Sequence, residues 1–132
     1  MINPISLGVS GLLAASKKAA VAAENIANAS TTSRLDGTGP NAYQAASVIT
    51  ESIAGGGVQA VAVPRTPAFV PSFEPDSPFA NSDGLVAAPN VNLDEELINL
   101  KVAEQAYKAN AQSIRAGREM HDTLLDAVNK KV

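Results

Sequence analysis

The chain has 132 residues, with 10 basic and 13 acidic side chains and a formal net charge of −3. This balance disfavours nucleic-acid binding through a broad basic surface. The chain has no cysteine and one histidine, which excludes disulfide frameworks, thiol nucleophiles and cysteine-bound metals. Apolar residues make up 45% of the chain, but many are alanine, which buries little area. We therefore expect a thin core and a chain that gains stability by packing against copies or partners.

The N-terminal segment lacks the features of a cleaved secretion signal. Its first basic residues, Lys17 and Lys18, follow the apolar part instead of preceding it. No window approaches 18 apolar residues, so neither a transmembrane helix nor direct membrane insertion is expected. The sequence thus predicts a cytosolic protein, or one that leaves the cell by a route without a cleaved leader.

Residues 5–29 are predicted to form a first helix. Small or apolar side chains recur at alternating intervals of three and four residues, which is the heptad pattern of a coiled-coil seam. Alanine along this seam permits the close approach of another helix, and the polar run that starts at Asn28 ends the helix. The seam consists of Ile5, Val9, Leu12, Ser16, Ala19, Ala23 and Ile26.

Residues 30–91 form a proline- and glycine-rich insert. Seven of the eight prolines lie here, which excludes a continuous helix. Side chains alternate over residues 43–53 and again over 58–63, and glycines 55–57 between them can turn the chain, so a β-hairpin is predicted. A lone hairpin is marginal in water and must lean on the helices or on a neighbouring subunit.

The rest of the insert, residues 64–91, is expected to be extended and irregular. Its prolines break up any regular pattern. We expect three aromatic side chains to anchor it: Phe69, Phe73 and Phe79.

Residues 92–128 are predicted to form a second, longer helix. Asn92 is a favourable N-cap, and three acidic residues follow it at the positive end of the helix. Asn110 either sets the register through a buried hydrogen bond or faces solvent, and the sequence leaves both possibilities open. Residues at intervals of seven form the seam, with further residues beside it: Leu93, Leu100, Tyr107, Ile114, His121 and Val128, then Leu97, Ala103, Asn110, Gly117, Leu124 and Leu125.

These patterns predict a mainly α-helical fold with a small β insert. The expected segments are an N-terminal axial helix in residues 1–29, the insert with its β-hairpin in 30–91 and a C-terminal axial helix in 92–132, together forming one structural unit. Two helices with matching heptads most simply pack on each other, here as an antiparallel coiled coil joined by the proline- and glycine-rich segment.

No constellation of residues points to catalysis, a cofactor or a metal. His121 has no carboxylate or metal ligand three or four residues away, which favours a structural or interfacial role. The acidic run 94–96 could hold a metal, but helix-start electrostatics explain it without one. Glycines 55–57 lack the lysine and hydroxyl residue of a phosphate loop. We therefore expect a non-enzymatic protein without cofactors.

Several residue strings resemble the flagellar axial proteins. The string ENIANAST at 24–31 is similar to their "NIANA-x-T" signature, and SGLLAA at 10–15 to their "SGL-x-A" start. Three further strings narrow the resemblance to the proximal-rod branch: EPDSP at 74–78, DGLV with PNVN at 83–92, and EELINL with AYKAN at 95–110. The match covers nearly the whole chain, so the chain resembles the flagellar basal-body proximal rod proteins.

The resemblance implies a structural subunit of the periplasmic rod, which transmits torque from the motor to the hook. It implies helical, head-to-tail assembly through the terminal helices, with copies of itself and other rod proteins as partners. It also implies export, without a cleaved signal peptide, through the flagellar type III export apparatus. The residues expected to make subunit contacts are Leu12, Asn25, Ile26, Asn28, Leu97, Leu100, Tyr107, Asn110, Ile114 and Leu124.

A cytosolic helical adaptor or an export-chaperone-like binding protein is the alternative function. It would account for the heptads and the acidic balance, but not for the matched strings. An adaptor would stay soluble on cell fractionation, whereas a rod subunit would purify with basal bodies.

Overall fold

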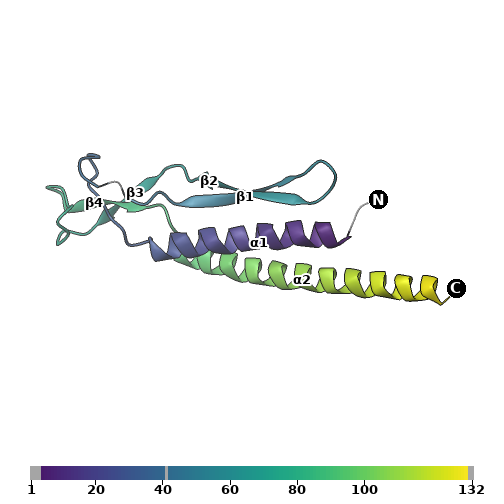
Figure 1. Ribbon diagram of the computed structural model, residues 1–132. Helices are drawn as coiled ribbons and strands as arrows, with labels where there is room; N and C mark the ends of the chain where they lie inside the picture. The colour runs from purple at the N-terminus through teal and green to yellow at the C-terminus, as the bar shows by residue number, and fades with distance from the viewer. Residues whose placement is uncertain (1–3, 41, 131–132) are drawn as a thin grey trace.

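In the computed structural model, two long helices lie side by side and a hairpin runs along one of them (Figure 1). The structure describes residues 4–40 and 42–130; the outer ends of the predicted terminal segments, residues 1–3 and 131–132, lie outside them. The prediction of a mainly helical chain with a β-hairpin insert between terminal helices is confirmed. The elements are α1 (Pro4–Ala27), β1 (Ala46–Ser52), β2 (Val58–Pro64), β3 (Phe69–Phe73), β4 (Leu85–Pro89) and α2 (Leu93–Asn129).

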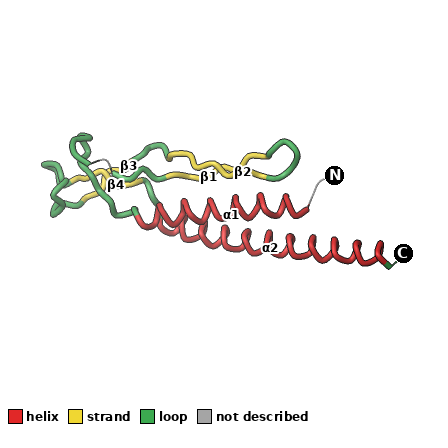
Figure 2. Tube along the Cα trace, in the orientation of Figure 1, coloured by secondary structure: helices red, strands yellow, loops and turns green. Residues whose placement is uncertain are grey.

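Polar side chains fix both helix boundaries next to the insert. Asn92 caps α2, because its Oδ1 accepts hydrogen bonds from Asp94 N at 3.1 Å and Glu95 N at 3.3 Å. After α1, Asn28 donates from its side chain to Glu24 O at 2.9 Å, and the same carbonyl accepts from the Asn28 backbone amide at 3.1 Å. Both boundaries lie at the same end of the molecule (Figure 2).

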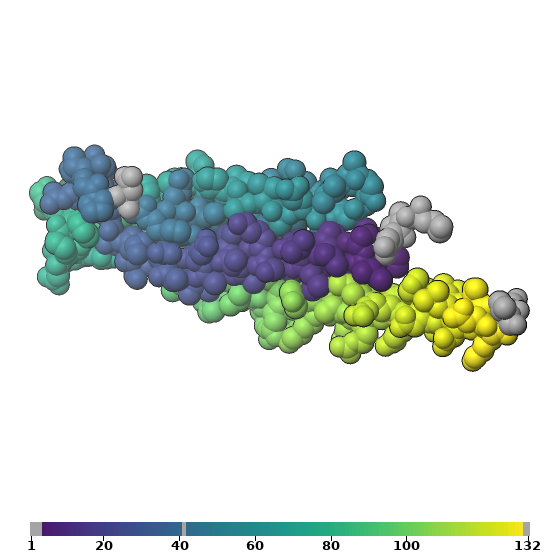
Figure 3. Space-filling model, in the orientation of Figure 1, coloured from purple at the N-terminus to yellow at the C-terminus, as the bar shows by residue number. Residues whose placement is uncertain are grey.

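Helix α1 is the central layer of the molecule. It lies between α2, which runs in the opposite direction, and the hairpin of β1 and β2 (Figures 1 and 2). The hairpin covers α1 along most of its length, and the last turns of α2 project beyond the start of α1 (Figure 3). Both exposed layers therefore depend on the surface that α1 presents.

The seam predicted for the first helix is wrong at three of its seven positions, and the other four are half-buried. Val9 is 42% exposed, and Ser16 and Ala23 are exposed too. Gly8, Ala15 and Ala22, each one residue earlier in the chain, are buried instead. Their small size lets α2 and the hairpin pack closely on two sides of α1. The buried residues of α1 are Gly8, Ala14, Ala15, Val21, Ala22 and Asn25.

The seam predicted for α2 is exposed at four of its six positions. Leu93, Tyr107, His121 and Val128 are exposed, whereas Leu100 and Ile114 are half-buried. Ala103 and Gly117, which were predicted to lie beside the seam, are buried instead. The two helices approach most closely where the side chains are smallest. The buried residues of α2 are Glu96, Ala103 and Gly117.

Residues 64–91 are more regular than predicted, because they form a second antiparallel hairpin. Phe69 of β3 pairs with Pro89 of β4, and Phe73 with Leu85. The prolines in this segment argued against strands. In a two-stranded hairpin, however, each strand is an edge strand, and a proline whose nitrogen faces away from the partner removes no hydrogen bond between the strands. The turn is held by Asn81 Oδ1, which accepts from Asp83 N and Leu85 N, both at 2.9 Å.

The prediction that three phenylalanines anchor this segment is mostly wrong. Phe73 is 70% exposed and Phe69 is also exposed, while Phe79 is half-buried. The second hairpin is tied to the molecule instead by backbone bonds, since Ser33 and Ala87 exchange hydrogen bonds of 3.0 and 2.9 Å. The aromatic side chains are thus left on the surface of this lobe.

Helix α1 is long and apolar enough, by length and composition alone, to cross a membrane. This corrects the expectation that no segment approaches a transmembrane helix, since alanine and valine raise its hydropathy despite Lys17 and Lys18. Core helices of other proteins pass the same test, and α1 packs against α2 and the hairpin.

The close helix approach predicts opposite effects for one substitution at two sites. A Cβ at Gly8 would lie 2.5 Å from Ile114 Cγ1, whereas at Gly117 it would lie 3.4 Å from Ile5 Cγ1. Overpacking costs about 1–3 kcal/mol, and Gly→Ala in a helix gains about 1 kcal/mol. In urea denaturation followed by circular dichroism, Gly8→Ala should lower the unfolding free energy and Gly117→Ala should raise it. Equal effects of the two variants would contradict this packing.

Candidate functional site

The contact between α1 and α2 is closest at two glycines. A Cβ at Gly11 would lie 2.2 Å from Asn110 Oδ1, and one at Gly8 would meet Ile114. Asn110 is half-buried in this contact and donates from Nδ2 to Ala106 O at 2.8 Å. The question left open by the sequence is thereby answered: Asn110 lies in the seam, but its hydrogen bond stays within its own helix.

Asn25 joins α1 to the base of the first hairpin. Its Nδ2 donates to Ala46 O at 2.8 Å, and its Oδ1 accepts from Ala46 N at 3.1 Å. The carboxamide therefore pairs with the edge of β1 as a neighbouring strand would. Tyr43 adds a third bond, with its hydroxyl donating to Asn25 Oδ1 at 2.8 Å. Asn25 is fully buried and every polar group of its side chain is used in this junction.

The surroundings of Tyr43 favour its neutral form. Burial raises the pKa of the Tyr43 hydroxyl, and the nearby charges of Glu24 and Glu96 raise it further. The hydroxyl therefore keeps its proton and remains the donor that Asn25 needs.

Arg65 joins the same hairpin to α2. Its Nε donates to Ser47 Oγ at 3.0 Å, and its Nη2 forms an ion pair with Glu96, whose side chain is almost wholly buried. Glu95 lies 3.5 Å from the same nitrogen, and Asn90 O accepts from Nη1 at 3.4 Å. A buried carboxylate is costly without such a partner, so the guanidinium fixes where β2 ends relative to the start of α2.

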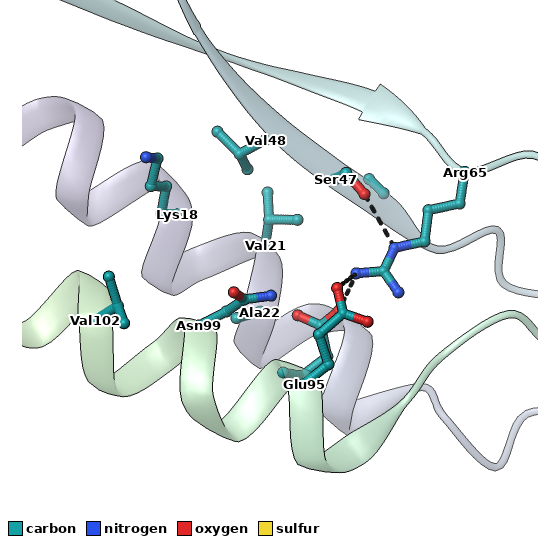
Figure 4. A pocket seen from close by; sticks show the side chains of 11 residues that line it. Lys18, Val21, Ala22, Ser47, Val48, Arg65, Glu95, Asn99 and Val102 are labelled. Atoms are coloured by element: carbon teal, nitrogen blue, oxygen red, sulfur yellow. Dashed lines mark hydrogen bonds and ion pairs between the residues drawn. The ribbon is translucent and has the colours of Figure 1, made fainter.

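This ion pair borders a hollow of about 280 Å³ between β1, α1 and α2 (Figure 4). Arg65 and Glu95 close one end, and Val21, Val48 and Val102 form much of the wall. No cluster of metal-ligating side chains occurs in residues 4–40 and 42–130. The described part of the chain thus offers junctions between elements and apolar surfaces.

Large apolar side chains are exposed along the outside of α2. Tyr107 is 49% exposed and Leu97 more so. Past Gly117 every described residue is exposed, and these last turns project beyond α1 (Figure 3). We call residues 118–129 the α2 overhang. Its exposed apolar side chains are Met120, Leu124, Leu125 and Val128.

The first hairpin presents a second apolar surface. Its inward face carries small side chains such as Ala60 and Ala62, whereas Ile49 and its cross-strand partner Val61 are exposed on the outer face. Apolar residues exposed on two sides of so small a chain are typical of a protein that associates.

The residues expected to make subunit contacts fall into three groups. Asn25 is buried in the junction with β1. Leu12, Ile26, Asn28, Leu100, Asn110 and Ile114 are half-buried, whereas Leu97, Tyr107 and Leu124 are exposed. The structure contains one chain, so contacts between subunits stay predictions for all ten.

Sequence reasoning missed Tyr43, Arg65 and Glu96 as residues that hold the fold together. Glu96 was interpreted as part of the helix start, and nothing near Arg65 in the sequence indicates its partner 31 residues away. One available signal was Asn25, a polar residue next to the predicted seam of an alanine-rich helix, which would need polar partners if it were buried.

Comparison of the sequence with known proteins identifies its family. Two family models match the sequence. The model described as "Flagella basal body rod protein" matches residues 5–33, and the one described as "Flagellar basal body rod FlgEFG protein C-terminal" matches residues 82–127. The flagellar basal-body rod protein FlgC of Agrobacterium fabrum is 32% identical over 121 residues, which cover 89% of this chain and 87% of that protein. The chain belongs to the FlgC-type flagellar basal-body rod proteins.

Other relatives of this rod family are similar to the chain to the same degree. FlgC of Salmonella typhimurium is 32% identical over 126 residues, and FlgC of Escherichia coli O6:H1 is 31% identical over 128 residues. Both alignments cover 91% of this chain and 92% of the relative. The family resemblance inferred from the sequence is therefore confirmed.

The Asn25 junction predicts a large loss of stability for a small substitution. Asn25→Ala leaves Ala46 N, Ala46 O and the Tyr43 hydroxyl without their partner, which should lower the unfolding free energy by about 2–4 kcal/mol. Asn28→Ala removes an exposed bond to Glu24 O and should cost about 0.5 kcal/mol. Urea denaturation measures both, and equal losses would contradict the junction.

Glu104 gives a pH-dependent prediction. Hydrogen bonds from Lys101 and Lys108 lower the pKa of its carboxylate from 4.5 to about 2. A lowered folded-state pKa adds stability above about pH 4.5 that is lost as the pH falls towards about 2. Glu104→Gln should therefore melt below the parent near neutral pH and converge with it in acid, while Glu119→Gln serves as the exposed control. A difference that persists below about pH 2 would contradict this assignment.

Proposed function

We propose that the chain is a structural, non-enzymatic subunit of the flagellar basal-body rod, held in place by packing between neighbouring subunits. The main support for this function is the apolar surface of α2, which no other described element of the chain covers. The rod-protein relatives also match the chain over about nine-tenths of their length. Family membership favours a rod subunit over a cytosolic adaptor.

The terminal helices are the assembly elements of this proposal. They act as an antiparallel coiled coil within the subunit, and the α2 overhang extends the helix pair beyond its own core. An overhang at one end and a lobe at the other favour head-to-tail contacts, which build an open helical assembly instead of a closed dimer. Such an assembly can transmit torque through packed helices.

The terminal segments and the insert have different proposed roles. Residues 1–29 and 92–132 form the axial layer with copies of the chain and other rod proteins, and residues 30–91 face outward or towards neighbours. The exposed outer face of the hairpin, with Ile49 and Val61, supports this role for the insert.

The proposed location is the periplasmic rod, reached through the flagellar type III export apparatus without a cleaved signal peptide. An export substrate must pass through the apparatus unfolded or partly folded. A core built largely from alanine and glycine, which is thin for the length of the chain, supports such a substrate.

A charge on the overhang tests this function without disturbing the core. Leu100 and Ile114 are half-buried between the helices, so a charge there would also unfold the chain. Leu124 is 61% exposed, and Leu124→Asp should leave the helix content unchanged yet reduce swimming at least about tenfold, because a charge in an apolar contact costs several kcal/mol.

The matched control is Thr123→Asp, at an exposed neighbouring position. Motility in soft agar and the amount of protein in isolated basal bodies are measured for both variants in a strain that lacks the parent gene. Normal swimming and normal incorporation of Leu124→Asp would contradict the role of the overhang.

A further inference from the structure

Two polar side chains of α1 hold opposite edges of the first hairpin. Asn25 pairs with Ala46 of β1 at the base, and Ser10 Oγ accepts from Val58 N of β2 at 3.2 Å at the tip. Fifteen residues separate Asn25 from Ser10, which is about 22 Å along the helix. Between them the hairpin rests on α1 through small side chains such as Ala60 and Ala62, which bury little area.

The two ends are held very differently. At the base, Asn25 and Ala45 are fully buried, three hydrogen bonds converge on the Asn25 carboxamide, and Arg65 adds the ion pair to Glu96. At the tip, Val58 is exposed and its amide makes one hydrogen bond. The base is therefore the rigid attachment of the hairpin and the tip is the weak one.

A hollow under the tip separates it further from the helices. About 510 Å³ of space lies between the tip and the two helices, bordered by Leu7, Ala14 and Ala106 among others. Apart from the contact of Gly57 with Ser10 and Leu7, this space leaves the tip without close packing on the helices. Gly57 also has φ +103°, and a Cβ there would lie 2.6 Å from Ser10 Oγ.

We propose that the first hairpin is a hinged arm, with Asn25, Arg65 and Glu96 as its fixed base and Ser10 as a latch at its tip. Opening the latch lifts the tip from α1 while the base stays attached, and it uncovers the apolar floor of the hollow. Ser10 and Asn25 both lie in the strings that resemble other axial proteins, so the proposal gives these residues roles within the chain.

Amide hydrogen exchange of the purified chain, resolved by NMR, tests the hinge directly. In the parent, the Val58 amide should exchange at least about tenfold faster than the Ala46 amide, because the tip opens without the base. Ser10→Ala should accelerate Val58 by at least about threefold and leave Ala46 unchanged. Ser16→Ala, an exposed serine on the same helix, is the matched control and should change neither amide.

Gly57→Ala opens the latch in a second way: its Cβ would displace the Ser10 hydroxyl, and φ +103° also strains an alanine at the tip itself. It should accelerate Val58 as Ser10→Ala does. Equal exchange of Val58 and Ala46 in the parent, or equal acceleration of both amides in either variant, would overturn the hinge. The measurement needs no rod assembly, so its outcome is independent of the proposed function.

The absence of cysteine permits a second readout. Spin labels on Glu51→Cys and Lys17→Cys report the distance from the tip region to α1, and labels on Thr66→Cys and Glu24→Cys report the base. Adding Ser10→Ala should broaden the first distance distribution and leave the second narrow. Broadening of both, or of neither, would overturn the proposal.

Discussion

The small size of the side chains along α1 is the constraint on which the rest of the structure depends. Gly8, Gly11, Ala15 and Ala22 let α2 and the hairpin approach α1 from two sides. The same residues bury little apolar area, so the layers gain little from hydrophobic packing alone. The positions of α2 and the hairpin relative to α1 must therefore be fixed by specific polar contacts. The large apolar side chains lie mostly on the outer surface.

Polar junctions supply that geometry. The Asn25 carboxamide takes the place of a strand beside β1, and the ion pair between Arg65 and Glu96 ties the end of β2 to α2. Such contacts are directional, so they fix orientation even where they add little net stability. The outer surface of α2 and the overhang then carry the apolar residues that an isolated chain cannot cover, which accords with membership of a family of rod proteins.

The sequence predicted the elements better than it predicted their contacts. Caps, glycine turns and heptad spacing are local signals, so Asn92, the turn at 55–57 and both helices could be predicted. Which positions of the seam face a partner could not be predicted, because the close approach that buries Gly8 and leaves Val9 exposed depends on the element packed against the helix. The β3–β4 ribbon was hidden by its prolines, and the partners of Asn25 and Arg65 lie 21 and 31 residues away.

The central claim is that this chain leaves apolar helix surface uncovered for open-ended association. Sedimentation velocity with circular dichroism, on the purified chain over a wide range of concentration, tests it most directly. The account predicts species whose mass grows with concentration without stopping at a dimer, and helix content that rises as they grow. A monomer or closed dimer whose mass stays constant over the whole concentration range would contradict it.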